Sequence, residues 1–482
     1  MDIRDWSLLT DLYELTMMQG YYKSPQEGKT VVFDLFYRNN PSDGGFAITC
    51  GLAQVIEYIE NLHFSDTDLS YLKDLCIFTD DFIDYLRNFK FTGDIYAIAE
   101  GTVVFPMEPL LQVRAPIMEA QLVETALLNI INHQSLIATK AARVVWAAEG
   151  EAVLEFGLRR AQGPDAGTYG ARAAVIGGCV GTSNVLTGKL FDVPVKGTHA
   201  HSWVMSFDNE LDAFRSYAKQ FPDACILLVD TYNTLEQGVP NAIQCFKEMK
   251  EAGFKLPGYG IRLDSGDLAY ISKRARQMLD DAGYSDAIIS ASSDLDENLI
   301  ASLKVQGAKI TLWGVGTKLI TSDDCPAFGG VYKLAAETDG SGRFVPKIKL
   351  SNNPQKVTLP GIKKVIRIYD KATNKIKADL IALNYEHYDE NKTLTLFDHT
   401  ATWKHMELEP GTYYLRELLE PVFLNGKCVY TSPKTMEIRQ YAMKELNTLW
   451  DEHKRLSNPH IVPVDLSEDL YILRERLIRE LK

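Results

Sequence analysis

Two acidic segments combine residue types that bind polar ligands. Asp264 and Asp267 flank a Ser-Gly pair directly after an apolar run, and Asp230 follows the apolar run 224–229. A carboxylate at the end of a strand could hold sugar hydroxyls or, directly or through water, a magnesium ion. A carboxylate in the same place could also orient a neighbouring histidine. We therefore take Asp230 and Asp264 as candidate site residues.

A His-x-His pair, His199 and His201, offers two kinds of chemistry. In amidohydrolase-type barrels such a pair at a strand end ligates a metal, together with histidines from later strands. No histidine lies between residues 202 and 345, which argues against a metal-dependent amidohydrolase-type barrel. The alternative is that one histidine acts as a nucleophile or acid/base, oriented by a carboxylate such as Asp230.

Candidate anion-binding residues follow two other apolar runs. Arg159 and Arg160 come shortly after Phe156. A guanidinium matches two oxygens of a carboxylate or phosphate, and an aromatic ring stacks on a flat ligand. A surface arginine pair over a core phenylalanine would have the same sequence. The Gly-x-Gly-Thr motif at 314–317 is either a phosphate cradle at a helix start or a tight strand-to-helix turn.

These segments occupy equivalent positions within residues 145–345. Short apolar, strand-like runs end in polar corners, and helical stretches separate most of them. Continuous apolar strands that alternate with helices indicate a parallel sheet buried on both faces. Seven such units favour a closed or nearly closed barrel, with the chemistry where the strands end. We expect an irregular seven-stranded TIM-like α/β barrel.

The flanking segments predict the remaining organisation. Residues 1–144 mix helical and strand patterns, whereas residues 346–482 begin with strand patterns and end in two amphipathic helices. We therefore predict an α/β protein with an N-terminal α+β domain (1–144) and a catalytic barrel domain (145–345). The C-terminal segment (346–482) would add its strands to the N-terminal domain, giving a second α+β domain, and pack its helices against it.

Composition excludes several classes of protein. The 482 residues are 46% apolar and 24% charged, which is ordinary for a globular protein and excludes wholesale disorder. A net charge of −13 argues against broad nucleic-acid binding. No apolar run approaches the roughly 18 residues of a membrane span. The seven cysteines lack C-x-x-C spacing, which favours reduced thiols and a cytoplasmic location.

Taken together, the motifs resemble those of the nicotinate phosphoribosyltransferase family, in the type II phosphoribosyltransferase group. The similarity covers most of the chain and is carried by residues 9–17, 156–165, 181–186, 197–202, 261–267 and 349–351. The resemblance implies that nicotinate and phosphoribosyl pyrophosphate form nicotinate mononucleotide and pyrophosphate in NAD salvage, coupled to ATP hydrolysis through a phosphohistidine. It also implies a homodimer with shared active sites. Magnesium would arrive with the pyrophosphate and ATP rather than at a fixed protein site.

The resemblance also assigns residues. His201, within Gly-Thr-His-Ala-His-Ser, would be the phosphorylated residue, and His199 occupies a variable position. Asp230, Arg262 and Asp264 would complete the catalytic set, with Asp264 at the ribose hydroxyls. The substrate-binding set would comprise Tyr13, Arg38, Phe156, Arg159, Ser183, Ser293, Asp294, Gly316, Thr317 and Lys349.

Within the binding set, the resemblance divides the substrate among its members. Phe156 would stack on one face of the pyridine ring and Tyr13, from the partner subunit, on the other. Arg159 would approach the ring carboxylate and the leaving group. The phosphate contacts would be Ser293, Asp294, Gly316 and Thr317 at the 5′-phosphate, and Arg38 (across the dimer), Lys349, Ser351 and Lys356 at the pyrophosphate or ATP.

Ser183 bears on specificity. The related nicotinamide enzyme has an acidic residue there, which accepts a hydrogen bond from an amide NH₂ and would repel a ring carboxylate. A serine can donate to that carboxylate, so we expect nicotinate rather than nicotinamide, the nearest alternative substrate. A non-enzymatic nucleotide-binding module is a further alternative, and the four catalytic residues kept together argue against it.

Overall fold

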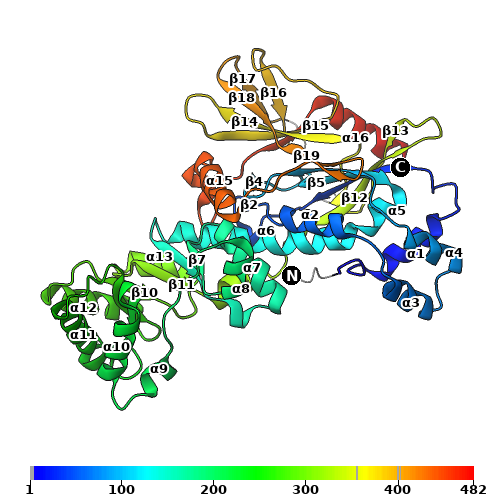
Figure 1. The fold of residues 1–482 in the computed structure, drawn as a ribbon. Helices are drawn as coiled ribbons and strands as arrows, with labels where there is room; N and C mark the ends of the chain where they lie inside the picture. Colours follow the sequence, from blue (N-terminus) through cyan, green and yellow to red (C-terminus); the bar gives the residue numbers. More distant parts are fainter. Residues whose placement is uncertain (1–4, 354–355, 399–400, 402, 482) are drawn as a thin grey trace. The chain divides into compact units, whose positions relative to one another are not determined.

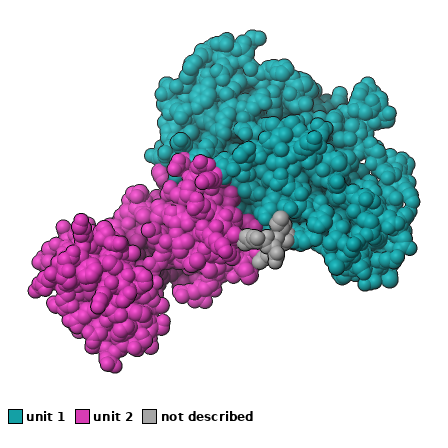
Figure 2. All heavy atoms as spheres, in the orientation of Figure 1, with its two compact units in different colours: residues 1–136, 327–433, 441–482 teal, residues 137–326, 434–440 magenta. Residues whose placement is uncertain are grey.

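The structure is a computed structural model that describes residues 5–353, 356–398, 401 and 403–481. The chain divides into two compact units (Figure 2). Unit 1 comprises residues 1–136, 327–433 and 441–482, and unit 2 comprises residues 137–326 and 434–440. Helices and strands alternate along the chain (Figure 1), so the predicted mixed α/β class is confirmed. Within the described ranges, no helix is long and apolar enough to cross a membrane.

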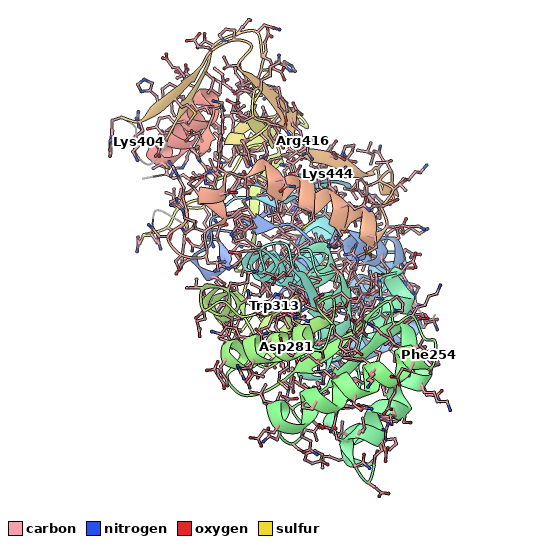
Figure 3. The ribbon with its side chains drawn as sticks, turned by 90° about the vertical axis from the view of Figure 1, so that its left-hand side faces the viewer. Phe254, Asp281, Trp313, Lys404, Arg416 and Lys444 are labelled. Atoms are coloured by element: carbon pink, nitrogen blue, oxygen red, sulfur yellow. The ribbon has the colours of Figure 1, made fainter. Side chains whose placement is uncertain are left out.

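Unit 2 is built on a parallel sheet of short, buried strands. In sheet order these are β7 (Gly181–Thr182), β6 (Ala152–Glu155), β11 (Leu312–Val315), β10 (Ile288–Ala291), β9 (Tyr259–Leu263) and β8 (Cys225–Leu228). Trp313 of β11 is fully buried and donates its indole N–H to Glu151 at 2.7 Å (Figure 3). Strands buried on both faces have continuous apolar sequences, which is the pattern found in this zone.

Helices follow the strands of unit 2, and four of these helices begin at a polar capping residue. The helices are α7 (Pro164–Ile176), α8 (Val185–Phe191), α9 (His201–Met205), α10 (Glu210–Gln220), α11 (Val239–Glu251), α12 (Leu268–Asp281), α13 (Glu297–Val305) and α14 (Thr317–Ile320). The side chains of Asn184, Asn209, Asp267 and Asp296 accept hydrogen bonds from the first turns of α8, α10, α12 and α13. Several polar corners therefore also cap helices.

The expected seven-stranded barrel is not confirmed, because the sheet has six strands. Beyond β7, Val195 makes only an isolated parallel bridge to Thr182. Farther along this segment, His199 Nε2 accepts a hydrogen bond from the backbone N–H of Leu228, in β8, at 3.2 Å. A side chain therefore reaches the sheet edge where a seventh strand would lie in a closed barrel.

Unit 1 contains an antiparallel sheet of seven strands. In order these are β13 (Phe344–Pro346), β12 (Val331–Thr338), β1 (Thr30–Phe36), β5 (Leu111–Pro116), β3 (Asp94–Ile98), β19 (Leu419–Leu424) and β20 (Lys427–Cys428). Strands from distant parts of the sequence alternate, since β12 pairs with β1 and β19 pairs with β3. A two-stranded sheet joins β2 (Ala47–Ile48) and β4 (Val103–Val104).

The N-terminal part of the chain, as far as the structure describes it, forms six α-helices. They are α1 (Leu12–Tyr21), α2 (Leu52–Asn61), α3 (Asp66–Asp74), α4 (Asp80–Arg87), α5 (Ile117–Leu122) and α6 (Glu124–Ala147). Helix α6 continues past residue 136, and β12 and β13 belong to unit 1. The compact units divide the chain at 136/137 and 326/327, whereas the predicted boundaries are 144/145 and 345/346.

A second sheet of unit 1 comes from the C-terminal third of the chain. In order its strands are β17 (His405–Leu408), β16 (Leu394–Phe397), β21 (Val464–Leu466), β15 (Ile376–Leu383), β14 (Lys363–Asp370) and β18 (Tyr413–Glu417). Two helices follow in this part of the chain, α15 (Thr435–Thr448) and α16 (Glu468–Glu480). One core of this sheet packs Leu470 of α16 against Ile381 and Leu466.

A fully buried ion pair joins two neighbouring strands of this sheet, β14 and β15. Arg367 of β14 donates from Nη2 and Nε to Asp379 of β15 at 2.6 and 2.9 Å, and neither side chain is exposed to solvent. Arg367 also donates to Glu445 at 3.3 Å. Removing one partner of such a pair leaves a buried charge without compensation.

We therefore expect Arg367→Met to lower the free energy of unfolding by about 3–5 kcal/mol. The measurement is the urea midpoint of the full chain, followed by circular dichroism. Lys377→Met is the matched control, since Lys377 pairs with Asp370 at 3.0 Å on the partly exposed side of β15. It should cost less than about 1 kcal/mol. Equal shifts in the two variants would contradict the assignment.

Candidate active site

Unit 2 has an open cavity of about 550 Å³ at one edge of its sheet. Its walls come from the segments that follow β6, β7, β9, β10 and β11. Parallel strands bring their carboxyl ends to the same edge, so the corners that follow them converge. The sequence-predicted residues that line the cavity are Phe156, Arg159, Ser183, His201, Arg262, Asp264, Ser293, Asp294, Gly316 and Thr317.

The aromatic wall of the cavity depends on the pairing of β6 with β11. The backbone N–H of Phe156 donates to Val315 at 2.8 Å, so the ring lies beside Gly314. A Cβ atom at residue 314 would lie 2.6 Å from the Phe156 ring, closer than side chains pack. The first glycine of the 314–317 motif therefore makes room for an aromatic ring.

His201 faces the cavity from the first residue of α9. Its Nδ1 lies 3.1 Å from the hydroxyl of Thr231, and its Nε2 lies 3.7 Å from a carboxylate oxygen of Asp264. The side chain is 39% exposed, so a ligand can reach the ring. The residue that orients the imidazole is Thr231, and not Asp230 as the sequence suggested.

Asp230 instead holds the neighbouring corner. One of its carboxylate oxygens accepts from the backbone N–H of Asp264 at 2.8 Å and from the hydroxyl of Ser265 at 2.6 Å. The Asp264 carboxylate in turn accepts from the hydroxyl of Ser292. Asp230 is thus a positioning residue, and it fixes the loop that presents Asp264.

Three arginines line the same cavity as this carboxylate. Arg262 donates to the hydroxyl of Thr198, and burial lowers the pKa of its guanidinium while Asp264 and Asp230 raise it. Arg159 and Arg160 lie in the short 3₁₀ turn Leu158–Arg160, where both are exposed and line the cavity. The cavity can therefore attract an anionic ligand although the whole chain is acidic.

The corner after β10 has an unusual backbone. Ser293 and Asp294 have φ angles of 102° and 25°, which residues with side chains seldom adopt. Consecutive backbone strain of this kind clusters at ligand-binding sites. The adjacent α14 begins at Thr317, and Lys318 pairs with Asp296 at 2.6 Å. This pair ties the start of α14 to the cap of α13.

Three members of the predicted substrate-binding set lie in unit 1 and do not line this cavity: Tyr13, Arg38 and Lys349. Arg38 and Lys349 lie near Lys333, which the sequence did not single out, and Tyr13 is linked to Lys333 through Glu124. Burial lowers the pKa of Lys333, the nearby Lys349 and Arg38 lower it further, and Glu124 and Glu14 oppose the shift.

Two carboxylates, Glu14 and Glu124, belong to the same cluster. Burial raises the pKa of Glu14 to about 7, and the side chain accepts a hydrogen bond from Gln121. Burial and the neighbouring Glu14 raise the pKa of Tyr13 above its usual range. Residues 13, 38, 333 and 349 therefore form one mixed-charge cluster, although more than 300 positions separate its ends.

The sequence predicted some of the remaining site residues and missed others. Ser183 is half-buried and donates its backbone N–H to Glu155 at 3.0 Å. The sequence analysis did not predict three side-chain contacts: Arg262 with Thr198, His201 with Thr231, and Asp264 with Ser292. The signal for them was their place immediately after a strand or beside a motif residue. Ser351 and Lys356 belong to unit 1 and lie outside the cavity lining.

The carboxylates do not form a metal-binding cluster in the part of the chain that the structure describes. No group of three or more His, Cys, Asp or Glu residues there could hold a metal ion. Asp264 and Asp294 line the cavity and could each supply an oxygen to a magnesium ion that arrives with phosphate groups.

His199 is a buried residue that packs within unit 2, although it lies two positions from the partly exposed His201. It is 8% exposed, packs edge-on against Tyr217 at 4.6 Å between ring centroids, and accepts the hydrogen bond from Leu228. Burial lowers the pKa of its imidazole to about 4. The ring is therefore neutral at pH 7 and serves as an acceptor at the sheet edge.

Comparison with known proteins finds a consistent match along the chain. Residues 8–132 match the model of the nicotinate phosphoribosyltransferase (NAPRTase) N-terminal domain, residues 152–326 that of the NAPRTase family and residues 362–474 that of the NAPRTase C-terminal domain. A nicotinate phosphoribosyltransferase of Bacillus subtilis (strain 168) is 49% identical over 478 residues, which cover 99% of this chain and 96% of the relative. One of Caenorhabditis elegans is 35% identical, covering 96% and 92%.

Solved structures agree with these relatives. Human nicotinic acid phosphoribosyltransferase superposes with a TM-score of 0.83 at 30% identity, over 98% of this chain and all of that one. The nicotinate-nucleotide pyrophosphorylase of Pyrococcus furiosus has a TM-score of 0.70 at 22% identity, over 92% of this chain and 96% of that one, which is a likeness of fold.

The buried His199 predicts a pH-dependent stability. The unfolded chain protonates this imidazole near pH 6.5, whereas the folded chain resists protonation until about pH 4. The unfolded state therefore binds more protons between these values, and stability falls as the pH drops through this window, by up to about 3 kcal/mol. His199→Gln keeps an acceptor for Leu228 but does not titrate. Its unfolding midpoint should fall less than that of the wild type between pH 6.5 and 4.5.

His201→Gln is the matched control, because the same change is made two residues away at an exposed ring. It should retain the pH dependence of the wild type. The His199 assignment fails if the three proteins lose stability in parallel as the pH is lowered.

Proposed function

Because the chain belongs to the nicotinate phosphoribosyltransferase family, we propose that it joins nicotinate to phosphoribosyl pyrophosphate. The products are nicotinate mononucleotide and pyrophosphate, for NAD salvage, and ATP hydrolysis is coupled through a phosphate carried on His201. The observation that carries the proposal is one cavity in which an aromatic ring, a histidine, carboxylates and arginines converge. The full-length match at 49% identity to a relative named for this activity supports it.

The transfer step needs placement more than proton removal. The bond from ribose C1′ to pyrophosphate breaks toward an oxocarbenium-like centre, and the nicotinate ring nitrogen forms the new bond to C1′. That nitrogen carries a lone pair and no proton, so orientation supplies much of the rate. Phe156 offers a flat face for the pyridine. Arg159 and Arg160 can pair with the ring carboxylate and with the charge that develops on pyrophosphate.

The remaining polar wall suits the ribose phosphate. Asp264 is fixed by its backbone contact to Asp230 and by Ser292, so its carboxylate is set to accept hydrogen bonds from ribose hydroxyls. The strained backbone at 293–294 and the start of α14 at 316–317 offer N–H groups to the 5′-phosphate. Magnesium bound to the pyrophosphate would neutralise part of its charge when present.

The ATP step uses His201 as a nucleophile. A ring nitrogen forms a bond to the γ-phosphorus while the bond from that phosphorus to the ADP oxygen breaks, and water later hydrolyses the phosphohistidine. The exposure of the imidazole to the cavity and the hydrogen bond to Thr231 support this role. Asp264, at 3.7 Å, can stabilise positive charge on the ring during the transfer.

The active enzyme is a homodimer in the cytoplasm. The cluster of Tyr13, Arg38, Lys333 and Lys349 supports shared sites, because it combines an exposed aromatic ring with several cations. In the dimer, Tyr13 of one chain would cover the second face of the pyridine in the other chain, and the cations would contact phosphates. The cytoplasmic location rests on the reduced-thiol pattern of the seven cysteines.

The role of His201 has a direct test. His201→Ala should abolish ATP hydrolysis and the acid-labile incorporation of ³²P from [γ-³²P]ATP, while a slow ATP-independent transfer to nicotinate remains. His199→Gln is the control and should keep the label. Label that persists in His201→Ala would place the phosphate on another residue.

The specificity role of Ser183 is tested separately. Ser183→Asp places a carboxylate near the expected position of the ring carboxylate, and repulsion should raise the KM for nicotinate by about tenfold or more. The KM for phosphoribosyl pyrophosphate should change less than about twofold. Ser183→Ala removes the hydroxyl without adding charge and should have a smaller effect. An unchanged nicotinate KM in Ser183→Asp would count against the assignment.

A further inference from the structure

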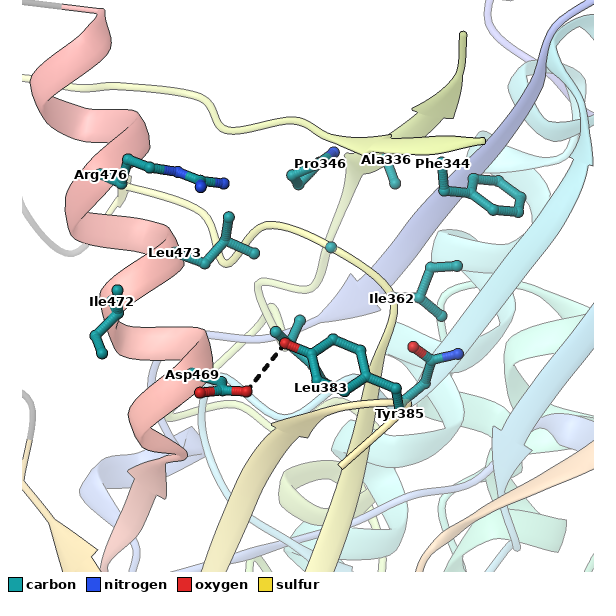
Figure 4. Close-up of a pocket in the computed structure, with 12 residues that line it drawn as sticks. Ala336, Phe344, Pro346, Ile362, Leu383, Tyr385, Asp469, Ile472, Leu473 and Arg476 are labelled. Carbon is teal, nitrogen blue, oxygen red and sulfur yellow. Dashed lines mark hydrogen bonds between the residues drawn. The ribbon is translucent and has the colours of Figure 1, made fainter. Parts of the chain in front are cut away.

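We propose that unit 1 holds a second ligand site, a cavity beside α16 that binds a small, flat, apolar molecule with one carboxylate or sulfonate group. The cavity measures about 430 Å³, which is a usual size for a small-molecule site. Its walls are formed by β12 and β13, the turn at 361–362, the end of β15 and one face of α16 (Figure 4). None of its lining residues belongs to the nicotinate cavity of unit 2.

The floor of the cavity is apolar and is kept open by a glycine. Gly361 has a φ of +82°, and a Cβ atom there would lie 2.9 Å from Leu383 and 3.6 Å from Leu473. The two leucines therefore approach each other across a position that has no side chain. Figure 4 shows Leu473 extending from α16 into the space in front of the strands. A ligand that fills this space must present an apolar face.

The rim of the cavity leaves apolar surface in contact with water. Phe344 on β13 and Ile472 on α16 are both exposed, and they lie on different walls of the cavity. Large apolar side chains that surround a concave opening are typical of a binding groove. A bound ring would cover part of each.

The mouth of the cavity has one charged side chain of each sign, and only the arginine is available to an anion. Asp469 accepts a hydrogen bond from the hydroxyl of Tyr385 at 3.1 Å and lies in the first turn of α16, where the helix dipole stabilises a negative charge. Arg476 is 61% exposed, and a carboxylate oxygen of Glu480 lies 3.8 Å from its guanidinium. In Figure 4 its guanidinium extends from α16 toward Pro346, across the opening. An arginine in this position can make a forked contact with a carboxylate or sulfonate.

The test uses 8-anilinonaphthalene-1-sulfonate, a fluorescent dye with a flat apolar body and one anionic group. The folded full-length chain should bind one dye per chain at this site. Arg476→Gln should weaken that binding about three- to tenfold, and Leu473→Trp should remove it by filling the cavity. Arg479→Gln is the matched control, an exposed arginine on the same helix that does not line the cavity, and it should bind the dye as the wild type does.

Further measurements keep the proposal falsifiable if Leu473→Trp fails to fold. Uncharged N-phenyl-1-naphthylamine should bind more weakly to the wild type, and Arg476→Gln should not affect it. The proposal is overturned if no dye binds, if Arg476→Gln binds as the wild type does, or if Arg159→Gln in unit 2 removes the signal. Dye binding could also weaken as the protein self-associates at higher concentration. That result would assign the surface to a second copy of the chain and would also overturn the proposal.

Discussion

The pairing of β6 with β11 is the constraint on which the cavity of unit 2 depends. These are the first and last strands of the unit 2 sheet along the chain, and they pair from Ala152–Leu312 to Glu155–Val315. Their parallel register brings Phe156 beside Gly314 and aligns the arginine turn after β6 with the start of α14. With the order β7-β6-β11-β10-β9-β8, every neighbouring corner then opens on the same edge. A slip of one residue would turn these side chains to the other face of the sheet.

The sequence was informative wherever a functional residue follows an apolar strand. Phe156, Ser183, Asp264 and Asp294 each lie within three residues of a strand end, so the alternation of strands and helices was enough to predict that they converge. The seventh strand of the expected barrel is not confirmed, because a polar corner near residue 198 looks the same in the sequence whether or not a paired strand precedes it. Pairing is a long-range property, and only Val195 of that segment forms a bridge.

The hydrogen-bond partners of the site residues were harder to predict than the positions of those residues in the fold. Asp230 and Thr231 are adjacent in sequence and point to different groups, so charge alone suggested the wrong partner for His201. The sequence did not predict a role for Lys333, because no local pattern distinguishes a functional lysine within an antiparallel strand from any other. Its shifted pKa comes from burial and from residues far away in the sequence. Such environments depend on the tertiary structure, and no local pattern encodes them.

The two helices that cross between the compact units limit how this protein can be dissected. Helix α6 runs through the boundary at 136/137, and α15 runs through that at 440/441. A fragment cut at either point would expose up to four N–H and four C=O groups that the intact helix pairs internally. Recombination at these two junctions could therefore not transfer unit 2 to another chain unless both helices were restored. Insertions and fusion points are better tolerated in surface turns such as 339–342, where Asp339 and Arg343 close a short hairpin between β12 and β13.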